Sequence, residues 1–178
     1  MTACDSLRAV FLAGLMAVAI DGQAVAQNDA VQQDAKVDKA IVDRSRAYMK
    51  DKQARHFNRA YAMIAASMRS YLTPALFESE ADRFLSEAGK PGDMRFTKVS
   101  WYRDPPEASE PGLYVAVDFT GTYANLELMC GYLMWRQGTD GQFQLVREEQ
   151  NFIDRHGAQQ MVPEQRQKLP DLFGCVSP

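Results

Sequence analysis

Two carboxylates lie in stretches that are otherwise apolar, and they are the residues best suited to acid–base chemistry. Asp118 falls within an alternating apolar segment at 113–120, and Glu148 falls within a second one at 143–153. A carboxylate that points into a protein is costly unless it is paired, so an inward orientation would indicate a functional site. The simpler expectation is that both face solvent from the polar side of half-buried strands.

The two histidines, His56 and His156, are the other candidates for proton transfer. Either one would need a pocket and a carboxylate partner, such as Asp118 or Glu148, to act as a general acid or base. Without such a partner they are exposed or capping residues, which is what we expect. The number and spacing of histidines and cysteines also predict neither a metal site nor a bound cofactor.

Cys130 and Cys175 allow three interpretations, namely a disulfide, a redox or metal-binding pair, and two separate buried thiols. The absence of a C-x-x-C spacing argues against catalytic redox chemistry. We expect the disulfide, which would close a loop of about 46 residues. In the chain-entropy model such a bond stabilises a protein by roughly 3–4 kcal/mol.

The N-terminus resembles an export signal. Arg8 precedes an apolar run at 9–20, and Ala24-Val25-Ala26 has the small-x-small pattern of a signal-peptidase site. The run is shorter than the roughly 20 residues that span a bilayer. We expect cleavage after Ala26, with loss of Cys4 and a periplasmic or secreted product. A buried N-terminal helix and a retained anchor are the alternatives.

Composition indicates one globular domain without a nucleic-acid partner. The 178 residues are 46% hydrophobic, and the formal charge is −3, or −2 without the expected signal. Residues 27–36 are polar and predicted to be flexible. Residues 37–154 are predicted to form the domain, and 155–178 a tail docked through Cys175.

A run of basic residues crosses the first predicted helix. Between positions 36 and 59 the chain has eight basic and three acidic residues. Lys39, Arg46 and Lys50 are therefore candidates to contact an anionic lipid surface, a cell-wall polymer or an acidic protein. The alternative is a solvated helix face whose charge is balanced by the acidic third helix.

Hydrophobic periodicity predicts helices first and strands afterwards. Apolar residues at helical spacing predict a first helix from Val37 and a second across 57–68. The third helix begins at Thr73-Pro74 and ends at Gly89. Strands are predicted at 99–102, 113–120, 128–135 and 143–152, with a turn at 138–141 and a bulge between Leu145 and Val146.

This order of elements predicts an α+β fold with helices packed on one face of a curved antiparallel sheet. Tyr114, Tyr132 and Trp135 lie on the predicted strands. These aromatic side chains are candidates to line a binding pocket. The alternative is that they form the core of the sheet and its cross-strand pairs.

Several segments resemble the exported DUF4019 family: FNRAY (57–61), YLTP (71–74), GLYVAVDF (112–119), TYAN (122–125) and GQFQLV (141–146). The resemblance covers roughly residues 38–153. It implies a cone-shaped NTF2-like fold of about three helices on about four strands, with a possible internal pocket. Phe143 stands where the family more often has tryptophan, and Cys130-Gly131 and the cysteine-bearing tail also depart from the family pattern.

These observations favour an exported, non-catalytic module, monomeric or homodimeric, that binds an envelope protein or a small apolar ligand. The alternative is a hydrolase or isomerase of the cone fold that uses Asp118 or Glu148, with His56 as a further candidate. A third possibility is a structural protein with no ligand. An inward-facing carboxylate or histidine in a pocket would separate these hypotheses.

Overall fold

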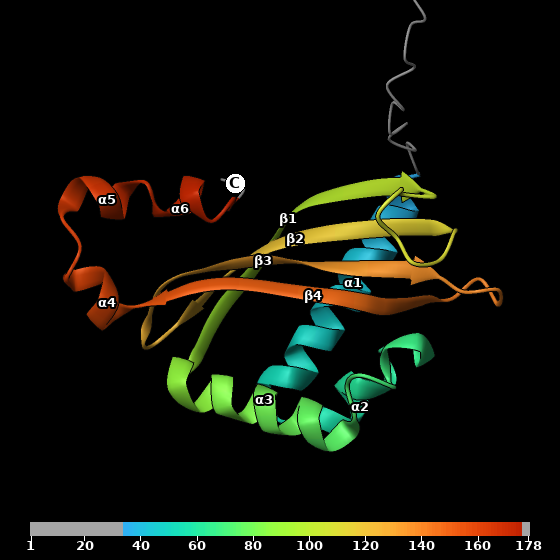
Figure 1. Ribbon diagram of the computed structural model, residues 1–178, viewed down its shortest axis with the longest axis horizontal. Coiled ribbons are helices and arrows are strands. Elements are labelled where there is room, and N and C mark those ends of the chain that lie inside the picture. Colours follow the sequence, from blue (N-terminus) through green and yellow to red (C-terminus); the bar gives the residue numbers. More distant parts are fainter. Residues whose placement is uncertain (1–33, 176–178) are drawn as a thin grey trace, which may run out of the picture.

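The computed structural model describes residues 34–175 and has the predicted α+β architecture (Figure 1). Helices come first, and four strands then form one antiparallel sheet in the order β1-β2-β3-β4. The sheet is not closed, because β1 and β4 do not pair with each other. The predicted export signal, its cleavage site after Ala26 and residues 27–33 lie outside the described residues.

The N-terminal helical elements are α1 (Ala35–Gln53), α2 (Phe57–Ala62), the 3-10 turn η1 (Ala66–Met68) and α3 (Pro74–Ala88). The strands are β1 (Pro91–Arg103), β2 (Leu113–Tyr123), β3 (Leu126–Gln137) and β4 (Phe143–Asp154). The tail consists of α4 (Arg155–Gln159), α5 (Pro163–Gln167) and α6 (Leu169–Leu172). Figure 1 shows α1 to α3 on one side of the sheet and the tail on the other.

Helix α1 begins two residues before the predicted Val37, because the Asp34 side chain accepts a hydrogen bond from the Lys36 main-chain N–H (2.8 Å). Helix α3 has the predicted ends. Thr73 caps its first turn through the Leu76 N–H, and Gly89 ends it with a φ of 79°, a conformation that favours glycine.

The second predicted helix is shorter than its apolar spacing suggested, since α2 ends at Ala62. The chain beyond it pairs with β4 instead. The Leu145 N–H donates to the Met63 carbonyl, and the Ala65 N–H donates to the Leu145 carbonyl, both at 2.9 Å. Because these main-chain groups bond to a strand far along the sequence, they cannot continue a helix. Ile64 still contributes a buried side chain to the core.

The core lies between the helices and the inner face of the sheet. Val115, Val117 and Leu133 are completely buried there. Trp135 is also completely buried and donates its indole N–H to the buried Ser45 hydroxyl (2.9 Å). Trp135 was a candidate either to line a binding pocket or to belong to the core. In the structure it belongs to the core.

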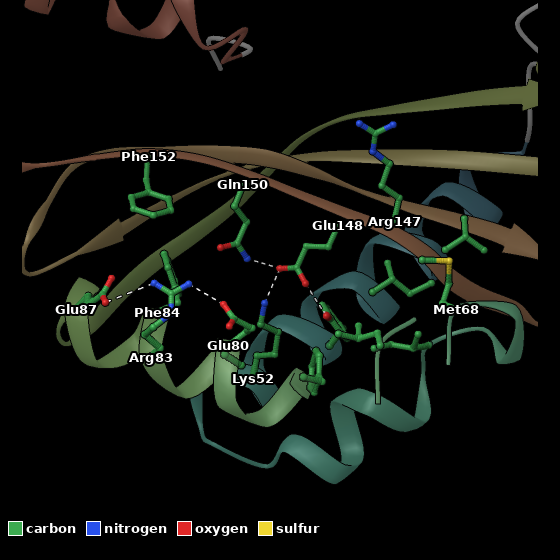
Figure 2. A pocket seen from close by; sticks show the side chains of 17 residues that line it. Lys52, Met68, Glu80, Arg83, Phe84, Glu87, Arg147, Glu148, Gln150 and Phe152 are labelled. Carbon is green, nitrogen blue, oxygen red and sulfur yellow. Dashed lines mark hydrogen bonds and ion pairs between the residues drawn. The ribbon is translucent and has the colours of Figure 1, made fainter. Parts of the chain in front are cut away.

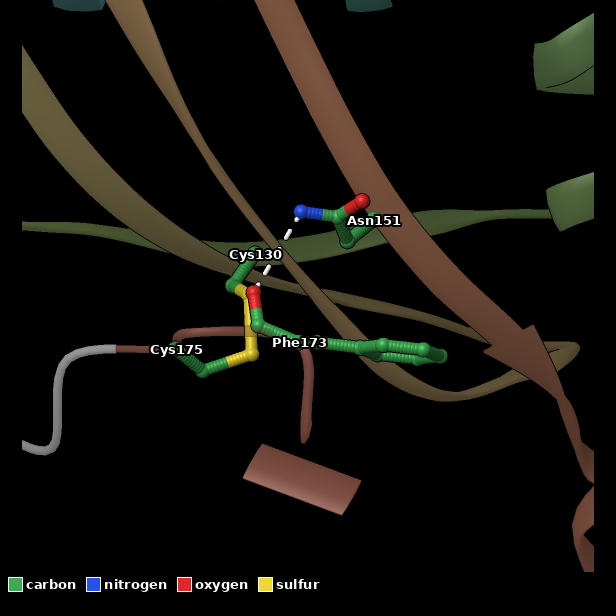
Figure 3. Close-up of a disulfide and its surroundings, with 4 residues drawn as sticks. All are labelled: Cys130, Asn151, Phe173 and Cys175. Carbon is green, nitrogen blue, oxygen red and sulfur yellow. Dashed lines mark hydrogen bonds between the residues drawn. A yellow bond between two sulfur atoms is a disulfide. The ribbon is translucent and has the colours of Figure 1, made fainter. Parts of the chain in front are cut away.

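The tail is bonded to the outer face of the sheet by the Cys130–Cys175 disulfide, as predicted (Figure 3). The two Cα atoms are 5.6 Å apart, within the range for disulfides. The Asn151 amide also donates to the Phe173 carbonyl (3.4 Å). Bonds of this kind persist in oxidising compartments.

Replacing both cysteines with alanine is expected to lower the free energy of unfolding by roughly 3–4 kcal/mol, because the unfolded chain gains loop entropy. Chemical denaturation of the oxidised wild type and the variant measures this difference. The reduced wild type is the control and should match the variant. Two free thiols in the exported protein, found by mass analysis after alkylation, would contradict the account.

Candidate functional site

A cavity of about 460 Å³ lies between α3 and β4 on the helix-covered side of the sheet (Figure 2). The segment that connects α2 to α3 closes one end through Ile64, Met68 and Leu72. The volume falls within the range of ordinary small-molecule sites.

The apolar interior of the cavity is lined by side chains of α3 and β4 and of the segment that connects α2 to α3. Phe77, Ala81 and Phe84 recur at helical spacing along α3, so all three face the sheet. Phe84 packs edge-to-face against Phe152 of β4, with ring centroids 5.3 Å apart. Phe152 is 45% exposed, so this end of the cavity opens to solvent.

Glu148 is at the polar centre of the cavity, where three donors reach its carboxylate (Figure 2). The Lys52 ammonium binds Oε1 at 2.6 Å, and the Tyr48 hydroxyl donates to Oε2 at 2.6 Å. The Gln150 amide also donates to Oε1. The side chains of Lys52 and Glu148 are only 11% and 16% exposed, so this is a largely buried ion pair.

The sequence-based expectation that Glu148 faces solvent was therefore wrong, and the bulge in β4 explains why. Trp135 pairs with Leu145 and Met134 pairs with Arg147, which leaves Val146 as an extra residue. The bulge was predicted, but its effect on orientation was not: it brings Glu148 to the same face as Leu145. Figure 2 shows Arg147 on the opposite side of β4.

The electrostatics of this centre favour a fixed carboxylate rather than a free base. Burial, followed by the negative charge of Glu148 and the hydrogen bond to it, raises the pKa of Tyr48 well above its usual value. The phenol therefore remains a donor. Tyr48, Lys52 and Gln150 take three of the roughly four acceptor positions of the Glu148 carboxylate, so its orientation is fixed by these donors.

The rim of the cavity is charged. On α3, Arg83 forms ion pairs with Glu80 (2.6 Å) and with Glu87 (3.5 Å). These side chains are exposed, so their pairs contribute little to stability. The arrangement is an apolar interior, one polar centre and a polar entrance.

The other candidate acid–base residues are not brought to this cavity. Asp118 lies on the outer face of the sheet, where burial raises its pKa and the charge of Lys98 partly offsets the rise. The His56 side chain is 53% exposed and lies 3.5 Å from Asp51. His156 is exposed on α4 and contacts the Gln160 amide.

Two of the exposed basic residues of α1 are paired within the helix. Lys39 and Arg46 both form ion pairs with Asp43, at 2.5 and 2.7 Å, and Lys50 is exposed.

Lys52 is one of the eight basic residues between positions 36 and 59, but its side chain lies in the cavity. Its spacing from the buried Ile41, Ser45 and Tyr48 was the signal that could have placed it inside.

Within residues 34–175, no group of three or more histidine, cysteine, aspartate or glutamate side chains could hold a metal ion. No helix in that part of the chain is both long enough and apolar enough to span a bilayer.

Replacing Glu148 with leucine is expected to lower the free energy of unfolding by about 3–5 kcal/mol, because Lys52 would remain buried without a partner. The double variant Lys52→Met/Glu148→Leu should lose much less. Urea denaturation of the single and double variants measures the coupling. Glu80→Leu, which breaks an exposed pair, is the control and should cost less than about 1 kcal/mol. Additive losses in the double variant would contradict a coupled pair.

No curated protein and no solved structure matches this chain. A family described as "Protein of unknown function (DUF4019)" matches residues 44–147. The matched segment contains Tyr48 and Lys52 and ends one residue before Glu148. Since the match covers more than half of the sequence, the chain belongs to the DUF4019 family.

Proposed function

We propose that the protein is an exported, non-catalytic binding module that holds a small apolar ligand between α3 and β4. The observation that carries the proposal is the cavity of about 460 Å³, which has an apolar interior, one hydrogen-bonded centre and a charged rim. Small-molecule sites commonly combine apolar walls with a few fixed polar groups.

The lining suggests how such a ligand would lie. Its apolar body would contact Phe77, Phe84 and Phe152. Lys52 has three N–H donors and gives one to Glu148, so a ligand carbonyl or hydroxyl could accept another. Selectivity would then come from the position of one polar group along an apolar molecule.

The same geometry favours binding over the hydrolase or isomerase hypothesis. A general base needs a lone pair directed at the substrate, whereas Glu148 is paired with Lys52 and already accepts hydrogen bonds from three donors, which favours a structural role for its charge. Asp118 and Glu148 lie on opposite faces of the sheet, so they cannot act as a pair. His56 is exposed beside Asp51 and lies outside the set of residues that line the cavity.

The proposal also includes an NTF2-like fold and a location outside the cytoplasm. Helices that cover one face of a bent sheet, with a pocket between them, support an NTF2-like cone. The disulfide supports a periplasmic or secreted location after cleavage near Ala26.

Ligand binding is expected to respond to filling the cavity. The fluorescent apolar probe N-phenyl-1-naphthylamine should bind the wild type with increased emission. Ala81→Leu should reduce its affinity roughly tenfold or more, because the added side chain takes up volume in the cavity. Fluorescence titration measures this effect, and thermal unfolding checks that the variant is folded.

Ala116→Leu is the matched control, because it adds the same atoms on the outer face of the sheet. It should leave probe binding unchanged. Equal probe affinity in the wild type and Ala81→Leu would contradict the proposal, as would complete absence of probe binding.

A further inference from the structure

The outer face of the sheet carries a second hollow, of about 410 Å³. The pairing of β1, β2 and β3 determines which side chains form the floor of this hollow. Ala116 lies between Ser100 of β1 and Met134 of β3, so the short Ala116 side chain leaves space at the middle of the face. Tyr102 and Tyr132 lie along the sides of this floor.

The connection between β1 and β2 forms one wall, and the sheet holds it in place. The Tyr114 hydroxyl donates to the Glu110 carbonyl at 2.6 Å, and Arg136 forms an ion pair with the Glu110 carboxylate. Asp104 accepts a hydrogen bond from the Gly112 N–H at 2.6 Å. The hollow therefore has a defined wall rather than an open loop.

The charged groups around the hollow leave one carboxylate available on its floor. Glu149 is engaged by Arg147 and by the Tyr132 hydroxyl, and Glu110 is paired with Arg136. Asp118 has no hydrogen bond or ion pair within residues 34–175, although Lys98 is its cross-strand neighbour. Its carboxylate lines the hollow and is partly buried.

We infer that this hollow binds a small organic ammonium ion, with the cation beside Asp118 and its apolar substituents against Tyr132, the cross-strand neighbour of Asp118, and Ala116. A carboxylate next to aromatic faces is the chemistry that recognises alkylammonium groups. The Arg147 guanidinium lies 5.5 Å from the centroid of the Tyr132 ring and is paired with Glu149, so the Glu149 carboxylate offsets its positive charge. The inference does not depend on the proposed function, because it uses the opposite face of the sheet.

The test is an NMR titration of the isotope-labelled protein with choline and with benzylammonium. The neutral analogue 3,3-dimethyl-1-butanol is the matched control for choline, since it has the same shape without the charge. At least one of the two cations should shift the amides of residues 116–118 and 132–134. The neutral analogue should bind roughly tenfold more weakly than choline.

Variants separate this site from the inner cavity. Asp118→Asn should weaken cation binding roughly tenfold, and Ala116→Leu should block it. Lys98→Gln should strengthen binding, because it removes a competing positive charge. Ala81→Leu should have no effect. The inference is overturned if neither cation shifts these amides, if Asp118→Asn binds as tightly as the wild type, or if the neutral analogue binds equally well.

Discussion

The ion pair between Lys52 and Glu148 joins the helical layer to the sheet, and the candidate site depends on it. Both side chains are largely buried, so each requires the other as a partner. The hydroxyl of Tyr48 adds a second connection from α1 to the same carboxylate. Together these contacts fix the position of α1 against β4, which sets one side of the cavity that α3 closes.

A single extra residue in β4 makes this pair possible. Without Val146 as a bulge, the strict alternation from Leu145 would direct Arg147 and Glu149 inward and Glu148 outward. With the bulge, Glu148, Gln150 and Phe152 face the helices, while Arg147 and Glu149 pair on the outer face. The bulge therefore determines which side chains of β4 line the cavity between α3 and β4.

The sequence predicted the ends of a helix correctly where neighbouring residues determine them. Thr73, Pro74 and Gly89 marked the ends of α3, and the cysteine count predicted the disulfide. The end of α2 could not be predicted in this way, because it depends on main-chain bonds to Leu145. Lys52 was missed for a related reason: a lysine within a basic run resembles a solvated residue until its buried partner is known.

The central claim is that the cavity between α3 and β4 holds an apolar ligand. Native mass spectrometry of the protein purified from cells that export it tests this most directly. The account predicts an added small mass that survives purification in the wild type and is lost in Ala81→Leu. A bare protein under the same gentle conditions, in both the wild type and the variant, would contradict it.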